Sequence, residues 1–186
     1  MEILLPAVAV IILTLLYLIH LYNGLVRSRQ LAEEGWSGID IQLKRRADLI
    51  PNLVHTLRSY ATHERQTLDA VIAARNQALG VSAGDVSGRA AAEDALGQAL
   101  ARLFALAEAY PDLKASENFL GLQTSLETLE REIQMARRYY NGAARDLNVR
   151  IESVPSNLVA GHFGFTKKAY FEITEAIDRA LPQVSI

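Results

Sequence analysis

The 186-residue sequence contains no cysteine, only 5 prolines and no excess of basic residues. The absence of cysteine excludes disulfide bonds, iron–sulfur clusters, thiolate nucleophiles and zinc sites built on cysteine. Because 19 Lys and Arg residues are balanced by 21 Asp and Glu residues, the charge pattern argues against nucleic acid as a partner. Half of the residues are hydrophobic, so the chain is too apolar to be disordered.

Residues 1–22 are predicted to form a transmembrane anchor. Positions 3–22 read ILLPAVAVIILTLLYLIHLY, without one acidic or basic side chain, and a helix of this length spans roughly 30 Å, the thickness of the hydrocarbon core. A cleaved signal peptide would have a basic segment before a shorter apolar run, and no basic residue precedes this one. We therefore expect a retained single-pass helix.

The residues after this span predict its orientation. Tyr22 is expected in the aromatic belt at the membrane interface, and Arg27 and Arg29 follow it closely, whereas no Lys or Arg comes before it. Basic residues favour the cytoplasmic side of a membrane, so the N-terminus is predicted outside and the bulk of the chain in the cytoplasm.

Residues 23–186 are predicted to form an all-α, antiparallel, coiled-coil-like bundle. Apolar side chains recur at three- and four-residue steps from Trp36 to Leu79 and again from Phe119 to Ile151, with a shorter helix expected over about 89–110. Glycines and serines at 80–88 predict a loop, and no segment alternates as a strand would.

Prolines and glycines predict where these helices bend or end. Pro51 either kinks the first helix or lies in the first turn of a new one capped by Asp48; the apolar phase continues across it, which favours the kink. Breakers within 154–165 are expected to end the long helix that began near Phe119. Thr166 is then expected to cap a short C-terminal helix over 166–181.

The sequence shows no constellation suited to catalysis or metal binding. No carboxylate stands three residues before any of the four histidines, and no Gly-rich phosphate loop or nucleophile elbow is present. The candidates for an enzymatic site, Asp40, Asp48, His63 and Glu64, fall on different faces of one predicted helix. We therefore predict no catalytic residue, no cofactor and no metal ligand.

Several segments closely resemble the LemA family. They include YNGLVRSRQLAEEGWSGIDIQLKRRADLIPNLV at 22–54, ARNQA at 74–78, AEAYPDLKASENFLGLQ at 107–123, ARRYYNGAARDLN at 136–148 and PSNLVAGHFGF at 155–165. The resemblance implies a bacterial helical bundle anchored in the cytoplasmic (inner) membrane, with no agreed catalytic residues. It also implies an HtpX-like membrane metalloprotease as a partner.

The predicted anchor, the long helices and the lack of a catalytic or metal-binding motif together predict a scaffold or adaptor that self-associates and binds another membrane protein. One short helix among long ones leaves apolar surface uncovered, which favours a homo-oligomer. The candidate contacts are aromatic: Tyr139, Phe163, Phe165 and Phe171. The phenylalanines could instead fold back to close their own bundle. A bundle that binds a lipid or a small apolar ligand is the alternative function, and an enzyme is the third.

Overall fold

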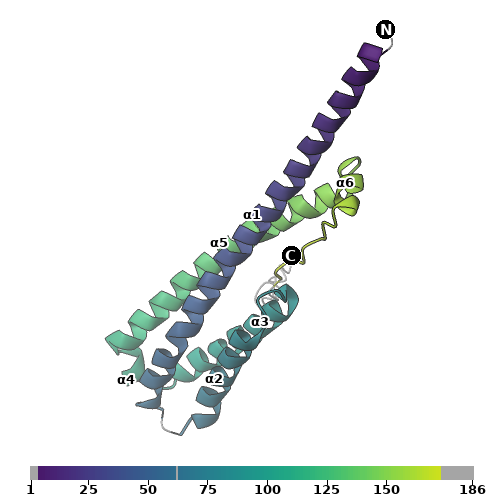
Figure 1. The fold of residues 1–186 in the computed structure, drawn as a ribbon. Coiled ribbons are helices and arrows are strands. Elements are labelled where there is room, and N and C mark those ends of the chain that lie inside the picture. Colours follow the sequence, from purple (N-terminus) through teal and green to yellow (C-terminus); the bar gives the residue numbers. More distant parts are fainter. Residues whose placement is uncertain (1–3, 62, 173–186) are drawn as a thin grey trace, which may run out of the picture. The chain divides into compact units, whose positions relative to one another are not determined.

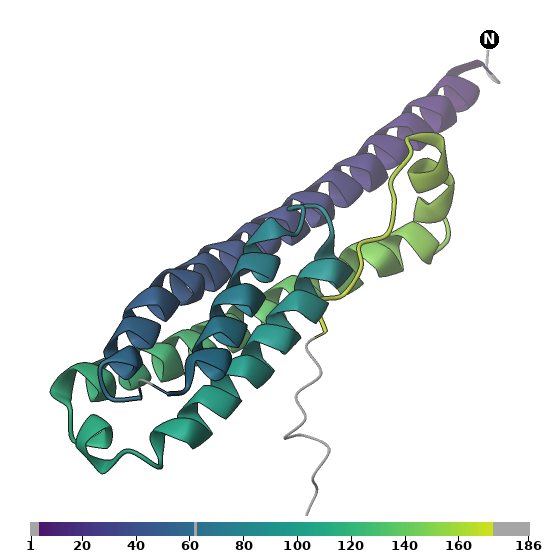
Figure 2. The same cartoon turned by 90° about the horizontal axis from the view of Figure 1, so that it is seen from below.

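The computed structural model describes residues 4–61 and 63–172, which form helices and connecting turns (Figure 1, Figure 2). The helices are α1 (Leu4–Arg58), α2 (Arg65–Gly80), α3 (Val86–Ala107), α4 (Pro111–Lys114), α5 (Glu117–Glu152) and α6 (Ser156–His162). No strand occurs in these two ranges, and the prediction of an all-α fold is confirmed.

The described residues divide into two compact units. Unit 1 contains the described residues up to Ile39 together with Ala136–Tyr170, and unit 2 contains Asp40–Met135 together with the described residues from Phe171 onward. The helices α1 and α5 each contribute residues to both units, whereas α2, α3 and α4 belong to unit 2 and α6 belongs to unit 1.

The first long helix ends earlier than its apolar pattern predicts. It continues through Pro51, so no new helix begins after Asp48, but it stops at Arg58 instead of reaching Leu79. The amides of Tyr60 and Ala61 both bond to the carbonyl of Leu57, which tightens the chain into a turn. The next helix, α2, starts after Glu64, the residue that interrupts the apolar stripe. A polar residue on an otherwise apolar helical face marked this boundary.

The connections around α3 follow local capping chemistry. The carboxylate of Asp85 accepts a hydrogen bond from the amide of Gly88 at 2.8 Å, and α3 therefore begins at Val86, within the predicted loop. Pro111 occupies the first turn of the short helix α4, where its missing amide hydrogen costs nothing.

The segment after α5 differs from its prediction in two ways. Within the stretch expected only to break the helix, residues 156–162 form α6. The expected C-terminal helix does not begin at Thr166, because residues 166–172 are not helical and the rest of its range lies outside the described residues. Side chains of α5 bind the backbone here: Asn148 pairs with Lys168, and the hydroxyl of Tyr140 donates to the carbonyl of Ala169 at 2.7 Å. The backbone groups of Lys168 and Ala169 thus bond to side chains of α5, where a helix would bond them to other backbone groups of the same segment.

Unit 2 is a helical bundle with an aliphatic core. The helices α2 and α3 lie side by side and antiparallel in both views (Figure 1, Figure 2). Residues of all five helices in the unit are buried together, among them Ile50, Leu53, Leu68, Leu96, Leu103, Leu113 and Phe119. The burial of this apolar surface stabilises the unit.

Unit 1 pairs α1 with the C-terminal part of α5. The ring of Trp36 lies 5.5 Å from that of the buried Tyr140. The two helices approach closely at Gly35, where a Cβ atom would lie 3.0 Å from the Cα of Tyr140 and 3.0 Å from the Cδ1 of Tyr139. Glycine at position 35 permits this packing, because a Cβ atom there would require its neighbours to move by a few tenths of an ångström.

Candidate functional site

The N-terminal part of α1 is an apolar helix with no packed face. Every side chain from Pro6 to His20 is exposed, although the stretch is composed almost entirely of aliphatic residues. The hydroxyl of Thr14 donates to the carbonyl of Val10 at 2.8 Å, so this polar group needs no solvent. By length and composition the helix can cross a membrane. An amphipathic helix of a soluble bundle would instead bury one apolar stripe.

Three aromatic rings meet where this apolar stretch ends. The ring of Tyr22 lies 4.7 Å from Phe163 and 5.9 Å from Phe165, measured between ring centroids. The guanidinium of Arg29 lies 5.2 Å from the centre of the Phe165 ring, within range of a cation–π contact. We call Tyr22, Phe163 and Phe165 the aromatic cluster.

The short helix α6 holds the aromatic cluster against α1. Val159 and Ala160 of α6 are buried with Leu25 of α1, and α6 lies beside α1 in both views (Figure 1, Figure 2). Gly164 then adopts a φ of +69°, a left-handed conformation that favours glycine. The amide of Phe165 closes the turn by donating to the carbonyl of Ala160 at 2.9 Å.

The residues predicted as oligomer contacts or as membrane-interface residues differ in how far they are exposed. Tyr139 and Phe163 are exposed, Phe165 is half-buried and Phe171 is fully buried. Phe163 and Phe165 both pack on Tyr22 of the same chain. This is the arrangement expected if the phenylalanines fold back onto their own bundle instead of contacting a second copy. The arginines predicted at the interface, Arg27 and Arg29, are both exposed.

Unit 2 contains a network of buried ion pairs that the sequence pattern did not predict. Arg46 of α1 donates to the carboxylates of Glu93 on α3 and Glu130 on α5. Glu93 also accepts from the Nε of Arg89 at 3.1 Å, and Arg89 lies 3.3 Å from the carboxylate of Asp40. Only 3% of the Arg46 side chain and 1% of the Glu93 side chain are exposed.

The network keeps its charges because they are paired. Burial alone would lower the pKa of Arg46, but the carboxylates of Glu130 and Glu93 outweigh this effect and raise it above its usual value. Arg46 is therefore a permanent cation that ties α1, α3 and α5 together. Such an arrangement fixes the register of the three helices within unit 2.

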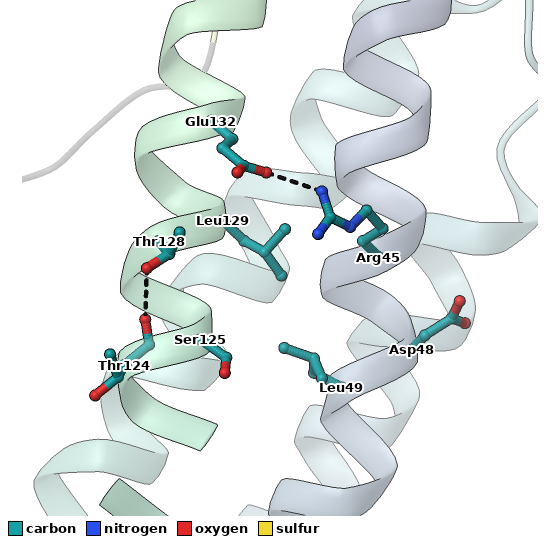
Figure 3. Close-up of a pocket in the computed structure, with 8 residues that line it drawn as sticks. All are labelled: Arg45, Asp48, Leu49, Thr124, Ser125, Thr128, Leu129 and Glu132. Atoms are coloured by element: carbon teal, nitrogen blue, oxygen red, sulfur yellow. Dashed lines mark hydrogen bonds and ion pairs between the residues drawn. The ribbon is translucent and has the colours of Figure 1, made fainter. Parts of the chain in front are cut away.

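A solvent-open groove lies in unit 2 between α1 and α5 (Figure 3). Its lining is mixed: Leu49 and Leu129 are apolar, but Arg45 and Glu132 form an ion pair of 3.0 Å across it. Thr124, Ser125 and Thr128 of α5 complete the wall, and each donates its hydroxyl hydrogen to a carbonyl of α5 itself. An open groove with this lining suits water better than an apolar ligand, so it does not favour the ligand-binding alternative.

The candidates for enzymatic chemistry do not converge. Asp40 pairs with Arg89, Asp48 lines the open groove, His63 is exposed and Glu64 directly precedes α2 without a capping hydrogen bond from its side chain. Among residues 4–61 and 63–172, no group of three or more acidic or histidine side chains could hold a metal ion.

Comparison with protein families matches residues 35–186 to the LemA family. This chain belongs to the LemA family. The match covers all of unit 2 and, from unit 1, residues 35–39 and 136–170, which include the aromatic cluster's two phenylalanines, so the resemblance predicted from the sequence is confirmed.

Named relatives of this LemA-family chain include two groups of bacterial proteins. Magnetosome protein MamQ 2 of Paramagnetospirillum magneticum is 27% identical over 181 residues, covering 84% of this chain and 66% of the relative. Magnetosome protein MamQ of Magnetospirillum gryphiswaldense is 25% identical, covering 88% and 70%. Protein LemA of Metamycoplasma hominis is 29% identical over 158 residues, covering 82% and 69%. The chain thus spans about two thirds of the length of these relatives.

Proposed function

We propose that this LemA-family chain is a single-pass, membrane-anchored helical scaffold that self-associates and binds another membrane protein. The observation that carries the proposal is the stretch from Pro6 to His20, which is apolar and exposed on every side. Such a surface is unfavourable in water and favourable in lipid. The similarity to proteins named for the magnetosome supports placement at a bacterial membrane.

The proposed division of the chain is an anchor at 1–22 followed by a LemA-like bundle domain at 23–186. With Arg27 and Arg29 just beyond the span, the orientation places the N-terminus outside and the packed helices in the cytoplasm. The chemistry of the described side chains supports a binding role, since the buried charges are paired with one another. An HtpX-like membrane metalloprotease is the partner that the family resemblance favours.

Membrane fractionation tests the anchor. The full chain should stay in the membrane pellet after an alkaline wash, while a chain that lacks residues 1–22 should be soluble and helical by circular dichroism. A reporter fused after Ile186 should be active only in its cytoplasmic form. An alkaline phosphatase fusion with activity would contradict the orientation, and a washed-off full chain would contradict the anchor.

Self-association is tested with single introduced thiols, because the chain has no cysteine of its own. Tyr139 is an exposed aromatic residue on α5, so Tyr139→Cys should cross-link two copies in the membrane. Ala101→Cys, on the exposed side of α3, is the matched control. If both variants cross-link at the same low rate, Tyr139 is not at an interface between copies.

A further inference from the structure

The geometry points to a second membrane contact in unit 1: the turn between α5 and α6, with the residues that follow α6, dips into the boundary between lipid headgroups and acyl chains. This inference rests on the proposed anchor, because it places the contact beside the point where α1 leaves the bilayer. We call Val154, Leu158 and Phe163 the interfacial patch.

The interfacial patch is apolar and uncovered by the rest of the chain. Val154 is 80% exposed, Leu158 is 71% exposed and Phe163 is 58% exposed. The opposite side of α6, through Val159 and Ala160, is buried against Leu25. Leu158 on the exposed side of α6 and Val159 on its buried side are both apolar, and Val154 and Phe163 flank the helix, although a short surface helix in water would keep one side polar.

The patch is continuous with the predicted membrane span. Phe163 packs on Tyr22, the last residue of that span, and α6 packs on Leu25, less than one helical turn further along α1. If Tyr22 lies at headgroup depth, contact with its ring brings Phe163 to the same depth. Aromatic side chains are favoured at this level of a bilayer.

The local charges suit a lipid surface. Residues 153–171 contain no Asp or Glu, and their two charged residues are Lys167 and Lys168. Both lysines are paired with carboxylates outside this segment, Lys167 with Glu152 and Lys168 with Glu33 at 3.9 Å. The segment therefore presents no unpaired acidic group that would repel lipid phosphates. The bilayer is thus the partner that accounts for both the apolar patch and its missing acidic residues.

Depth-dependent quenching of tryptophan fluorescence tests the contact in the full-length protein. Trp36 is the only tryptophan, so Trp36→Phe provides a silent background into which one tryptophan is placed at a time. The test variants are Phe163→Trp and Leu158→Trp, with Tyr17→Trp as the reporter of the anchor and Ala101→Trp as the water-exposed control. Each is measured in phosphatidylcholine–phosphatidylglycerol vesicles with bromine atoms near the headgroup or near the chain end. Circular dichroism confirms that each variant keeps its helices.

The proposed contact predicts a distinct pattern. Tryptophan at 17 should lose most of its emission with deep bromines, tryptophan at 163 and 158 should be quenched most by shallow bromines and tryptophan at 101 should be unaffected. If 17 is quenched while 163 and 158 behave like 101, the interfacial contact is overturned and the anchor stands. If the tryptophan at 158 has blue-shifted emission that neither brominated lipid quenches, the patch is covered by a second copy of the chain. That result would also overturn the proposed membrane contact. An unquenched tryptophan at 17 would refute the anchor itself.

Discussion

Asn148 and Lys168 exchange two hydrogen bonds: the amide of Lys168 donates to Oδ1 of Asn148 at 2.9 Å, and Nδ2 of Asn148 donates to the carbonyl of Lys168 at 2.9 Å. One buried side chain thus satisfies both backbone groups of a residue 20 positions away. This pairing fixes an extended segment along α5 where the sequence pattern predicted a helix.

Replacing Asn148 by Leu should destabilise unit 1. The substitution leaves the amide and the carbonyl of Lys168 without their partners, at a cost of about 1–3 kcal/mol. The midpoint of thermal unfolding, followed by circular dichroism in detergent, should fall, and the Lys168 amide should exchange its hydrogen faster. Asn52→Leu, at an exposed position of α1, is the control and should leave the midpoint nearly unchanged. Equal midpoints for the two variants would contradict the prediction.

Neighbouring arginines on α1 should respond very differently to the same change. Arg46→Met removes the cation between Glu93 and Glu130 and leaves Glu93 buried with Arg89 as its remaining partner, which should lower the free energy of unfolding by about 3 kcal/mol. Arg45→Met breaks an exposed pair with Glu132 and should cost at most about 1 kcal/mol. Denaturant unfolding of both variants measures the difference. Similar losses would mean that Arg46 is not held in a buried network.

The phenol of Tyr140 should make stability depend on alkaline pH. Burial raises its pKa, so above about pH 10, the value expected for an unfolded chain, the unfolded state releases the proton first and the folded state loses stability. At neutral pH, Tyr140→Phe should be less stable by about 1 kcal/mol, because the hydrogen bond to Ala169 is lost.

This deficit of Tyr140→Phe should shrink as the pH rises through about 10, since phenylalanine cannot ionise. Unfolding measured at several pH values gives the gap between the two proteins. Tyr139→Phe, at the exposed neighbouring position, should match the wild type throughout. A gap that stays constant with pH would show that Tyr140 ionises equally easily in both states.

Two glycines of α1 should give opposite results when replaced by alanine. At Gly35, the new Cβ would lie 3.0 Å from the Cα of Tyr140, so the two helix backbones must shift by a few tenths of an ångström, at a cost of about 1–3 kcal/mol. At Gly38, no atom lies within 4 Å of the added Cβ, and alanine should stabilise the helix by about 0.5–1 kcal/mol. Thermal midpoints of Gly35→Ala and Gly38→Ala should move in opposite directions. A stabilised Gly35→Ala would show that the close approach is absent.

Hydrophobic periodicity predicted much of the helical fold. The stripe from Phe119 to Ile151 corresponds to α5, which runs from Glu117 to Glu152. Of the two adjacent tyrosines, Tyr140 lies in register with that stripe and is buried, whereas Tyr139 is out of register and exposed. These features could be predicted because the spacing of apolar residues along a long amphipathic helix shows which of its faces is buried.

Other features depend on partners distant in the sequence. Arg46 lies between the buried Leu43 and Ile50, and Glu93 lies between the buried Ala90 and Leu96, so each charge interrupts an apolar helical face. Only the tertiary fold shows that opposite charges meet there. The same holds for the residues after Thr166, where side chains of α5 override the local preference for helix.

The aromatic cluster was predicted only in part. Tyr22, Phe163 and Phe165 were each singled out from the sequence, but as separate interface and contact residues. Their meeting depends on the packing of α6 on Leu25 and on the left-handed Gly164, neither of which has a local signature in the spacing of apolar residues.

Within unit 1, α1 passes from its exposed apolar stretch to the packed residues around Leu25 without a linker. A domain tethered by a flexible segment can swivel freely above a membrane, but a continuous helix transmits both tilt and rotation. With residues 3–22 in the bilayer, unit 1 would face its surroundings with one fixed side. Neighbouring copies in the same membrane would then share the same tilt relative to the bilayer. To bring matching surfaces together, two copies would need only to diffuse in the plane of the membrane and to rotate about the membrane normal.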